Sequence, residues 1–178
     1  RATPEAAYAD PRLSPPFRVR LSDTSQGGVL ILVPSLNPGE IFAGIATAIV
    51  IAVGLAEHGH PVILAATELP IGNPRATRAF VLSRSAAAQD VDKRLRLVCG
   101  KTVGCLTLPR DCAVLATAWW SAHVANTIID TAGLPRDRFF YLVQDYEPGF
   151  YPWGTEYAGA LSSYDFGATP IFNCLGLR

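Results

Sequence analysis

The chain has 178 residues, of which 49% are apolar and 17% are charged, and its 15 basic residues balance its 15 acidic ones. This composition predicts one globular domain and excludes a largely disordered protein. A net charge of zero also argues against a nucleic-acid-binding surface, which requires an excess of Lys and Arg. Because the sequence contains no Met, we expect it to be part of a longer protein.

The first part of the chain alternates apolar strands with helices after a proline-rich start. Residues 1–26 contain four prolines and predict an extended lead-in with one early strand at 17–21. The run "VLILV" at 29–33, bounded by glycines and a proline, predicts a buried parallel strand. An uncharged helix at 41–56 follows, shorter than the roughly 20 residues that a membrane span needs. The next predicted elements are a strand at 62–67, a helix at 74–88 and a strand at 94–98.

The second part continues the alternation. It predicts strands at 112–117, 139–144 and 169–174, and helices at 118–133 and 155–166. Strands that alternate with helices indicate an α/β fold, a Rossmann-like mainly parallel sheet with helices on both faces, over residues 27–178. Ligands of such sheets bind beyond the carboxyl ends of the strands. That rule selects three loops, at 34–44, 117–121 and 144–154.

Neither the cysteines nor the histidines have the spacing of a metal site. Cys99, Cys105, Cys112 and Cys174 contain no C-x-x-C pair and predict reduced thiols in a cytoplasmic protein, with a Cys99–Cys105 disulfide as the alternative. The histidines are expected in a helix-to-strand turn (His58 and His60) and on a helix face (His123). We therefore expect no bound metal.

The loop "PSLNPGEIFAGIATA" places Gly39 and Gly44 before a helix. Bare backbone N–H groups and the helix dipole at such a place suit a diphosphate. The loop is neither G-x-G-x-x-G nor a P-loop, so it does not indicate dinucleotide binding. The alternative is that the glycines serve only a turn and close packing of the helix on the sheet.

Two adjacent tryptophans, Trp119 and Trp120, begin the helix predicted at 118–133. A helix points neighbouring side chains in different directions. Either both tryptophans pack in the core, or one of them lines a ligand groove near the strand end.

The segment "VQDYEPGFYPWG" at 143–154 combines carboxylates with aromatic rings where a strand ends. Gln144, Asp145 and Glu147 can bind sugar hydroxyls, and a carboxylate can act as a general base. The aromatic side chains, which can pack on the C–H face of a pyranose, are Tyr146, Phe150, Tyr151 and Trp153. The residues alone leave a second reading open, an aromatic plug that closes the core.

Four stretches together resemble a known family. They are "LILVPSLNPGEIFAGIATAI", "GLAEHGHPVIL", "VLATAWWSAH" and "FFYLVQDYEPGFYPWGTEYA". The chain resembles, over about residues 28–173, the N-terminal domain of GT-B-fold rhamnosyltransferases that build bacterial polysaccharides and S-layer glycans. The first three stretches are less specific than the last.

The resemblance implies a glycosyltransferase with two Rossmann-like domains, of which this chain is the acceptor-binding one. The second domain, absent from this chain, would hold dTDP-L-rhamnose, and no metal or prosthetic group is implied. The chain alone is then expected to transfer no sugar. The implied partners are a glycan acceptor and a nucleotide sugar, without nucleic acid, and a peripheral association with the inner membrane is left open.

The resemblance also assigns roles to residues. Asp145 and Glu147 would be catalytic, and the loop at 39–47 would face the donor, although Ala43 stands where the family usually has glycine. The implied substrate-binding residues are Gly39, Ala43, Gly44, Thr47, Trp119, Gln144, Tyr146, Tyr151 and Trp153. The alternative is a non-catalytic carbohydrate- or nucleotide-binding module with the same fold. A nicotinamide-dependent oxidoreductase lacks its glycine fingerprint here.

Overall fold

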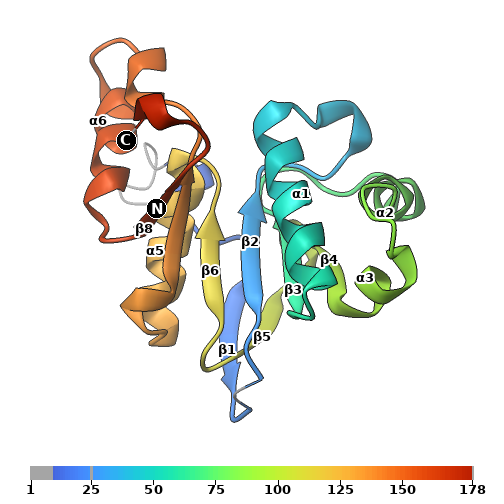
Figure 1. Ribbon diagram of the computed structural model, residues 1–178. Helices are drawn as coiled ribbons and strands as arrows, with labels where there is room; N and C mark the ends of the chain where they lie inside the picture. The colour runs from blue at the N-terminus through green and yellow to red at the C-terminus, as the bar shows by residue number, and fades with distance from the viewer. Residues whose placement is uncertain (1–9, 25, 178) are drawn as a thin grey trace, which may run out of the picture.

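The computed structural model describes residues 10–24 and 26–177, and its centre is a sheet of six parallel strands (Figure 1). The strands are β2 (Val29–Val33), β3 (Val62–Ala66), β4 (Leu95–Cys99), β6 (Ala113–Ala116), β7 (Phe139–Val143) and β8 (Thr169–Phe172). Across the sheet they run in the order β4-β3-β2-β6-β7-β8. The central strands are almost entirely buried, which explains why they are apolar without alternation.

This strand order is that of a doubly wound, Rossmann-like sheet. The prediction of an α/β fold with a mainly parallel sheet is confirmed. From β2 the chain adds strands toward one edge of the sheet, and from β6 it adds them toward the other edge. The two parallel strands pair from Val29 opposite Ala113 to Ile31 opposite Leu115. Such a reversal opens a crevice at the carboxyl ends of the two strands, which is where α/β proteins bind ligands.

Helices cover both faces of the sheet, as predicted (Figure 1). They are α1 (Ala43–Glu57), α2 (Pro74–Leu82), α3 (Ala88–Arg94), the short α4 (Gly100–Val103), α5 (Trp119–Ala132) and α6 (Thr155–Ser162). On one face α1 buries Ala48, Ala52 and Ala56, small residues that allow the helix to approach the strands closely. On the other face α5 buries Ile128 and Ile129 and ends at Gly133, whose positive φ of 71° closes the helix as predicted.

A second, two-stranded sheet packs against the α5 side. It pairs β1 (Arg18–Ser22) with β5 (Cys105–Pro109) in parallel. The early strand is confirmed within one residue, and Phe17 just before it is buried in the core. We did not predict β5, because the stretch is short and only its two leucines face the core. Residues 1–9 and 25 of the predicted lead-in lie outside the described residues, and the boundary at 26 stays a prediction.

Some predicted boundaries differ from those of the structure. The helix predicted at 74–88 ends at Leu82, where the Ser83 hydroxyl donates to the Phe80 carbonyl, and α3 follows as a separate helix. The helix predicted at 155–166 ends at Ser162 and continues as a 3-10 turn, Ser163–Asp165. In both places a serine hydroxyl bonds to a main-chain carbonyl near the helix end, which competes with the helical pattern.

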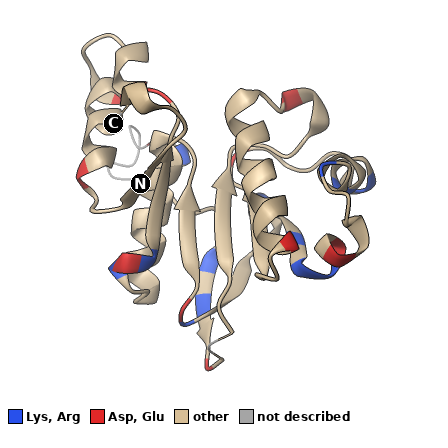
Figure 2. Ribbon diagram, viewed as in Figure 1, with Lys and Arg blue, Asp and Glu red and all other residues tan. Residues whose placement is uncertain are grey.

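Charged side chains are scattered over several elements, and basic and acidic residues are interspersed (Figure 2). No helix in residues 10–24 and 26–177 is long and apolar enough to cross a membrane. All four cysteines are free thiols, so the alternative of a Cys99–Cys105 disulfide is not formed.

Two helical glycines give opposite predictions for replacement by Ala. A Cβ at Gly159 of α6 would lie 2.8 Å from Cζ3 of Trp119, a buried side chain with little freedom to move. We expect Gly159→Ala to lower the free energy of unfolding by about 1–3 kcal/mol. Gly54 of α1 has open space around it, so Gly54→Ala should raise that free energy by about 0.5–1 kcal/mol. Urea unfolding measures both, and equal changes would contradict the packing of α6 on α5.

Candidate functional site

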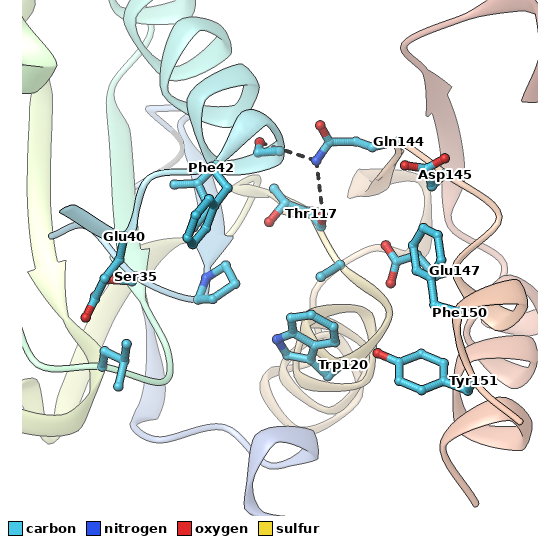
Figure 3. A pocket seen from close by; sticks show the side chains of 15 residues that line it. Ser35, Glu40, Phe42, Thr117, Trp120, Gln144, Asp145, Glu147, Phe150 and Tyr151 are labelled. Carbon is cyan, nitrogen blue, oxygen red and sulfur yellow. Dashed lines mark hydrogen bonds between the residues drawn. The ribbon is translucent and has the colours of Figure 1, made fainter. Parts of the chain in front are cut away.

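A cavity of about 580 Å³ lies at the carboxyl ends of β2, β6 and β7 (Figure 3). The three loops that the sequence selected all contribute to it, through residues 34–45, 117–120 and 144–151, and Leu69 after β3 adds to the wall. It opens where the strand order reverses, as expected for a ligand site of this fold.

Glu147 holds the start of α5. It is 8% exposed, and its Oε2 accepts a hydrogen bond of 2.7 Å from the main-chain N–H of Trp119, the first residue of the helix. Its Oε1 accepts a longer bond of 3.5 Å from the Tyr141 hydroxyl of β7. A carboxylate at this position complements the positive end of the helix dipole. The segment at 144–151 is thereby fixed to α5.

The Glu147 carboxyl has an unusual acidity. Burial raises its pKa to about 7, and the charge of Asp145 adds to the rise. Hydrogen bonds from the Trp119 N–H and the Tyr141 hydroxyl favour the ionised form and therefore oppose this rise in pKa. A carboxyl with this pKa exchanges protons near neutral pH, which suits a general acid or base.

Two main-chain N–H groups just before α5 are also bonded within the protein. Ser121 Oγ accepts from the N–H of Thr117 at 2.9 Å and from that of Ala118 at 3.0 Å. Together with the bond from Trp119 to Glu147, this satisfies three consecutive main-chain donors, those of residues 117–119.

Gln144 joins the three loops. Its Nε2 donates to the carbonyl of Gly44 at 3.3 Å and to that of Thr117 at 3.4 Å (Figure 3). The Gln144 amide occupies the space beside Gly44, where a Cβ would lie 2.8 Å from Nε2. A side chain at position 44 would therefore displace this amide, and the diphosphate contact of Gly44 stays a prediction.

The opposite wall is formed by the loop after β2. The Glu40 carboxylate accepts hydrogen bonds from the Ser35 hydroxyl and from Nδ2 of Asn37, and these bonds lower its pKa below the usual value. Asn37 also bonds to the carbonyl of Pro70, so the loop is tied to the one after β3. The loop thus presents a defined, negatively charged wall.

Large apolar side chains surround these polar groups. Phe42 is 75% exposed and Phe150 is 65% exposed, on opposite sides of the cavity. Trp120 lies between them at the base in Figure 3. Exposed aromatic rings on opposite sides of a cavity are typical of a binding surface.

The two tryptophans have different surroundings. Trp119 is 1% exposed, and its Nε1 donates to the Tyr151 hydroxyl at 3.0 Å. It therefore packs inside the protein and supports Tyr151, which lines the cavity. Trp119 was predicted to bind substrate, but it is Trp120 that reaches the cavity.

Of the predicted site residues, the cavity brings together Gly44, Gln144, Asp145, Glu147 and Tyr151. The others lie outside it. Gly39 and Ala43 are exposed on the loop and at the start of α1, and the Thr47 hydroxyl bonds back to the Ala43 carbonyl at 3.0 Å. Trp153 is 90% exposed and stacks on Tyr157. Tyr146 stacks on Tyr164, on the far side of the segment.

The histidines do not contribute to this cavity. His58 bonds the carbonyl of Gly54 through Nδ1 at 2.7 Å, and Nε2 of His123 lies 2.9 Å from the Gly159 carbonyl. His60 lines a separate cavity at the amino ends of the strands. Within the described residues no group of His, Cys, Asp and Glu has the arrangement of a metal site.

Comparison with known proteins identifies the family to which this chain belongs. Residues 29–174 match the family described as "WsaF, N-terminal domain". The O-antigen biosynthesis protein RfbC of Myxococcus xanthus is 38% identical over 98 residues, which cover 49% of this chain and 7% of that protein. The chain thus aligns with a small part of this curated relative. Since the family match covers most of the chain, including all three loops of the cavity, the protein belongs to the WsaF N-terminal domain family.

Proposed function

We propose that this chain is the acceptor-binding domain of a nucleotide-sugar-dependent glycosyltransferase that extends a surface glycan. The observation that carries the proposal is the cavity where the strand order reverses, which combines carboxylates with aromatic walls. Sugars present hydroxyls to carboxylates and C–H faces to rings, so this combination suits them. The family and the O-antigen relative support a role in glycan synthesis.

The charges around the cavity favour a sugar over a nucleotide. Its lining residues include Glu40, Asp145 and Glu147, and no Lys, Arg or His is found among the described residues that line it. Arg12, which stacks over Trp120, is paired with Asp10 and Glu156. A diphosphate would meet like charges here, and the N–H groups of residues 117–119 are already bonded within the protein.

The catalytic proposal gives the two carboxylates separate tasks. Glu147, with its pKa of about 7, accepts the proton of the acceptor hydroxyl as that oxygen bonds to the anomeric carbon of the donor. The nucleoside diphosphate departs with the electron pair of the bond that breaks. Asp145, which is exposed on the cavity wall, binds sugar hydroxyls.

The donor and its location are further parts of the proposal. We assign dTDP-L-rhamnose as donor and a second Rossmann-like domain as its main holder, in a GT-B arrangement in the cytoplasm. In that arrangement the loop at 39–47, with Gly39, Ala43 and Thr47, would lie toward the donor. Release of dTDP from dTDP-L-rhamnose by the 178 residues alone would contradict this division.

Charge discrimination follows from the cavity lining. At pH 8 and low salt, a neutral rhamnose trisaccharide is expected to bind at least about tenfold tighter than the same trisaccharide carrying a terminal glucuronate. Calorimetric titration of both ligands measures the difference. Glu40→Gln should reduce it, whereas Glu57→Gln at the far end of α1 should not. Tighter binding of the acidic ligand would contradict the assigned ligand class.

One observation favours a second candidate, a non-catalytic carbohydrate-binding module. Glu147 caps α5, and that structural task alone would account for a buried carboxylate. In an enzyme Glu147→Gln should lower the rate of sugar transfer, whereas in a binding module there is no transfer to lower. Glycan binding without transfer in the protein that carries both domains would favour the module.

A further inference from the structure

Three tyrosines form a stack behind the segment that carries Asp145 and Glu147. Tyr164, in the 3-10 turn after α6, lies between Tyr141 of β7 and Tyr146. Its ring centroid is 5.8 Å from that of Tyr141 and 6.3 Å from that of Tyr146, with interplanar angles of 20° and 10°. The stack fixes the direction in which the Tyr164 hydroxyl points.

That hydroxyl bonds the main chain on both sides of Tyr146. It accepts a hydrogen bond of 3.3 Å from the Glu147 N–H and donates one of 3.3 Å to the Asp145 carbonyl. The segment lies beyond the last pair of the β7–β8 ladder, Val143 opposite Phe172, so the sheet no longer restrains it. A single side chain therefore closes the turn from which both carboxylates project.

We propose that Tyr164 is a positioning residue, whose hydroxyl holds the main chain of 145–147 so that the Glu147 carboxylate stays on the Trp119 N–H beside the cavity. The proposal deepens the function proposed for Glu147 and rests on it. Its physical content, the position of one carboxylate, can be measured without sugar transfer.

Loss of the hydroxyl should change the surroundings of Glu147. The groups that face its carboxyl are the Tyr141 hydroxyl from β7, the Trp119 N–H from α5 and the charge of Asp145. With the turn released, the Glu147 N–H loses its partner and water reaches the carboxylate. Because burial is the main cause of its raised pKa, solvation should bring that pKa down.

The test is Tyr164→Phe, which keeps the stacked ring and removes only the hydroxyl. The Glu147 side-chain carboxyl is titrated by ¹³C NMR in the 178-residue chain. We expect its pKa to fall by at least about one unit, a tenfold change in proton affinity. Thr131→Val is the control, because it removes a hydroxyl near the far end of α5 that bonds only the Thr127 carbonyl. An unchanged titration in Tyr164→Phe overturns the proposal.

Hydrogen exchange and enzyme kinetics provide two further tests of the positioning role. In the unsubstituted chain the Glu147 amide should be protected from hydrogen exchange, and rapid exchange would also overturn the proposal. In the two-domain protein, Tyr164→Phe should lower kcat about 10- to 100-fold, shift the acid limb of the pH profile downward and change KM little. If the titration shifts but the unsubstituted two-domain protein transfers no sugar, the proposed function fails and the positioning role stands.

Discussion

Glu147→Gln is expected to lower kcat of sugar transfer in the two-domain protein by at least about 10²-fold. Glutamine keeps the size and can still accept the Trp119 N–H, so the cap on α5 survives while the proton acceptor is lost. KM for the acceptor should change by less than about threefold, because the hydroxyl-binding groups remain. Initial rates with dTDP-L-rhamnose and a rhamnose oligosaccharide measure both constants. A variant with full activity would leave Glu147 as a helix cap only.

The pH dependence has a defined sign. The base form is needed and the pKa of Glu147 is about 7, so kcat/KM should rise with pH up to about 7 and level off above it. In Glu147→Gln this rise should disappear.

Stability provides the control for Glu147→Gln. The folded pKa is raised from 4.5 to about 7, so the folded state retains a proton that the unfolded state has lost between these values. The stabilisation present below pH 4.5 is therefore lost as pH rises toward 7. Gln cannot ionise, and we expect the free energy of unfolding of the variant at pH 8 to be no lower than that of the original protein.

Replacement of the two neighbouring tryptophans by alanine should lower the free energy of unfolding by different amounts. Trp119 is buried against Tyr151 and Gly159, so Trp119→Ala should lower the free energy of unfolding by about 3–5 kcal/mol. Trp120 is only partly buried on the cavity wall, and Trp120→Ala should cost less than about 2 kcal/mol. Urea unfolding measures both losses.

For glycan binding, Trp120→Ala should have the larger effect of the two substitutions. Trp120→Ala removes a ring from the cavity and is expected to weaken glycan binding at least about tenfold, as loss of an aromatic anchor does. A folded Trp120→Ala variant with unchanged glycan affinity would exclude Trp120 from the binding surface. Greater loss of stability in Trp120→Ala than in Trp119→Ala would contradict the packing of α5.

The main sheet could be predicted because each of its inner strands is a short apolar run that ends at glycine, proline or a polar loop. Strand β5 could not, since only two of its five residues are buried and it pairs with β1, far away in sequence. Helix α3 was missed for a related reason, because only Val91 of its residues is fully buried. Periodic patterns reveal elements that bury a wide face and miss those that bury one or two side chains.

The position of the cavity could also be predicted from the sequence, because parallel strands end at one edge and bring their loops together. The role of single side chains was less accessible. The sequence left open which tryptophan faces the core, and that depends on Gly159 of α6 and on Tyr151. Glu40 and Tyr164 were missed, although Glu40 lies in a selected loop, because their partners are set by tertiary contacts.

The central claim is that the cavity binds the acceptor glycan, and the indole N–H groups of the three tryptophans test it directly. A neutral rhamnose oligosaccharide is titrated into the ¹⁵N-labelled chain and followed by NMR. Saturable shifts are predicted for the Trp120 indole and the Gln144 side-chain amide, while the indole of Trp153, which is 90% exposed outside the cavity, stays unchanged. Shifts confined to Trp153, or none at the cavity up to millimolar glycan, would contradict the account.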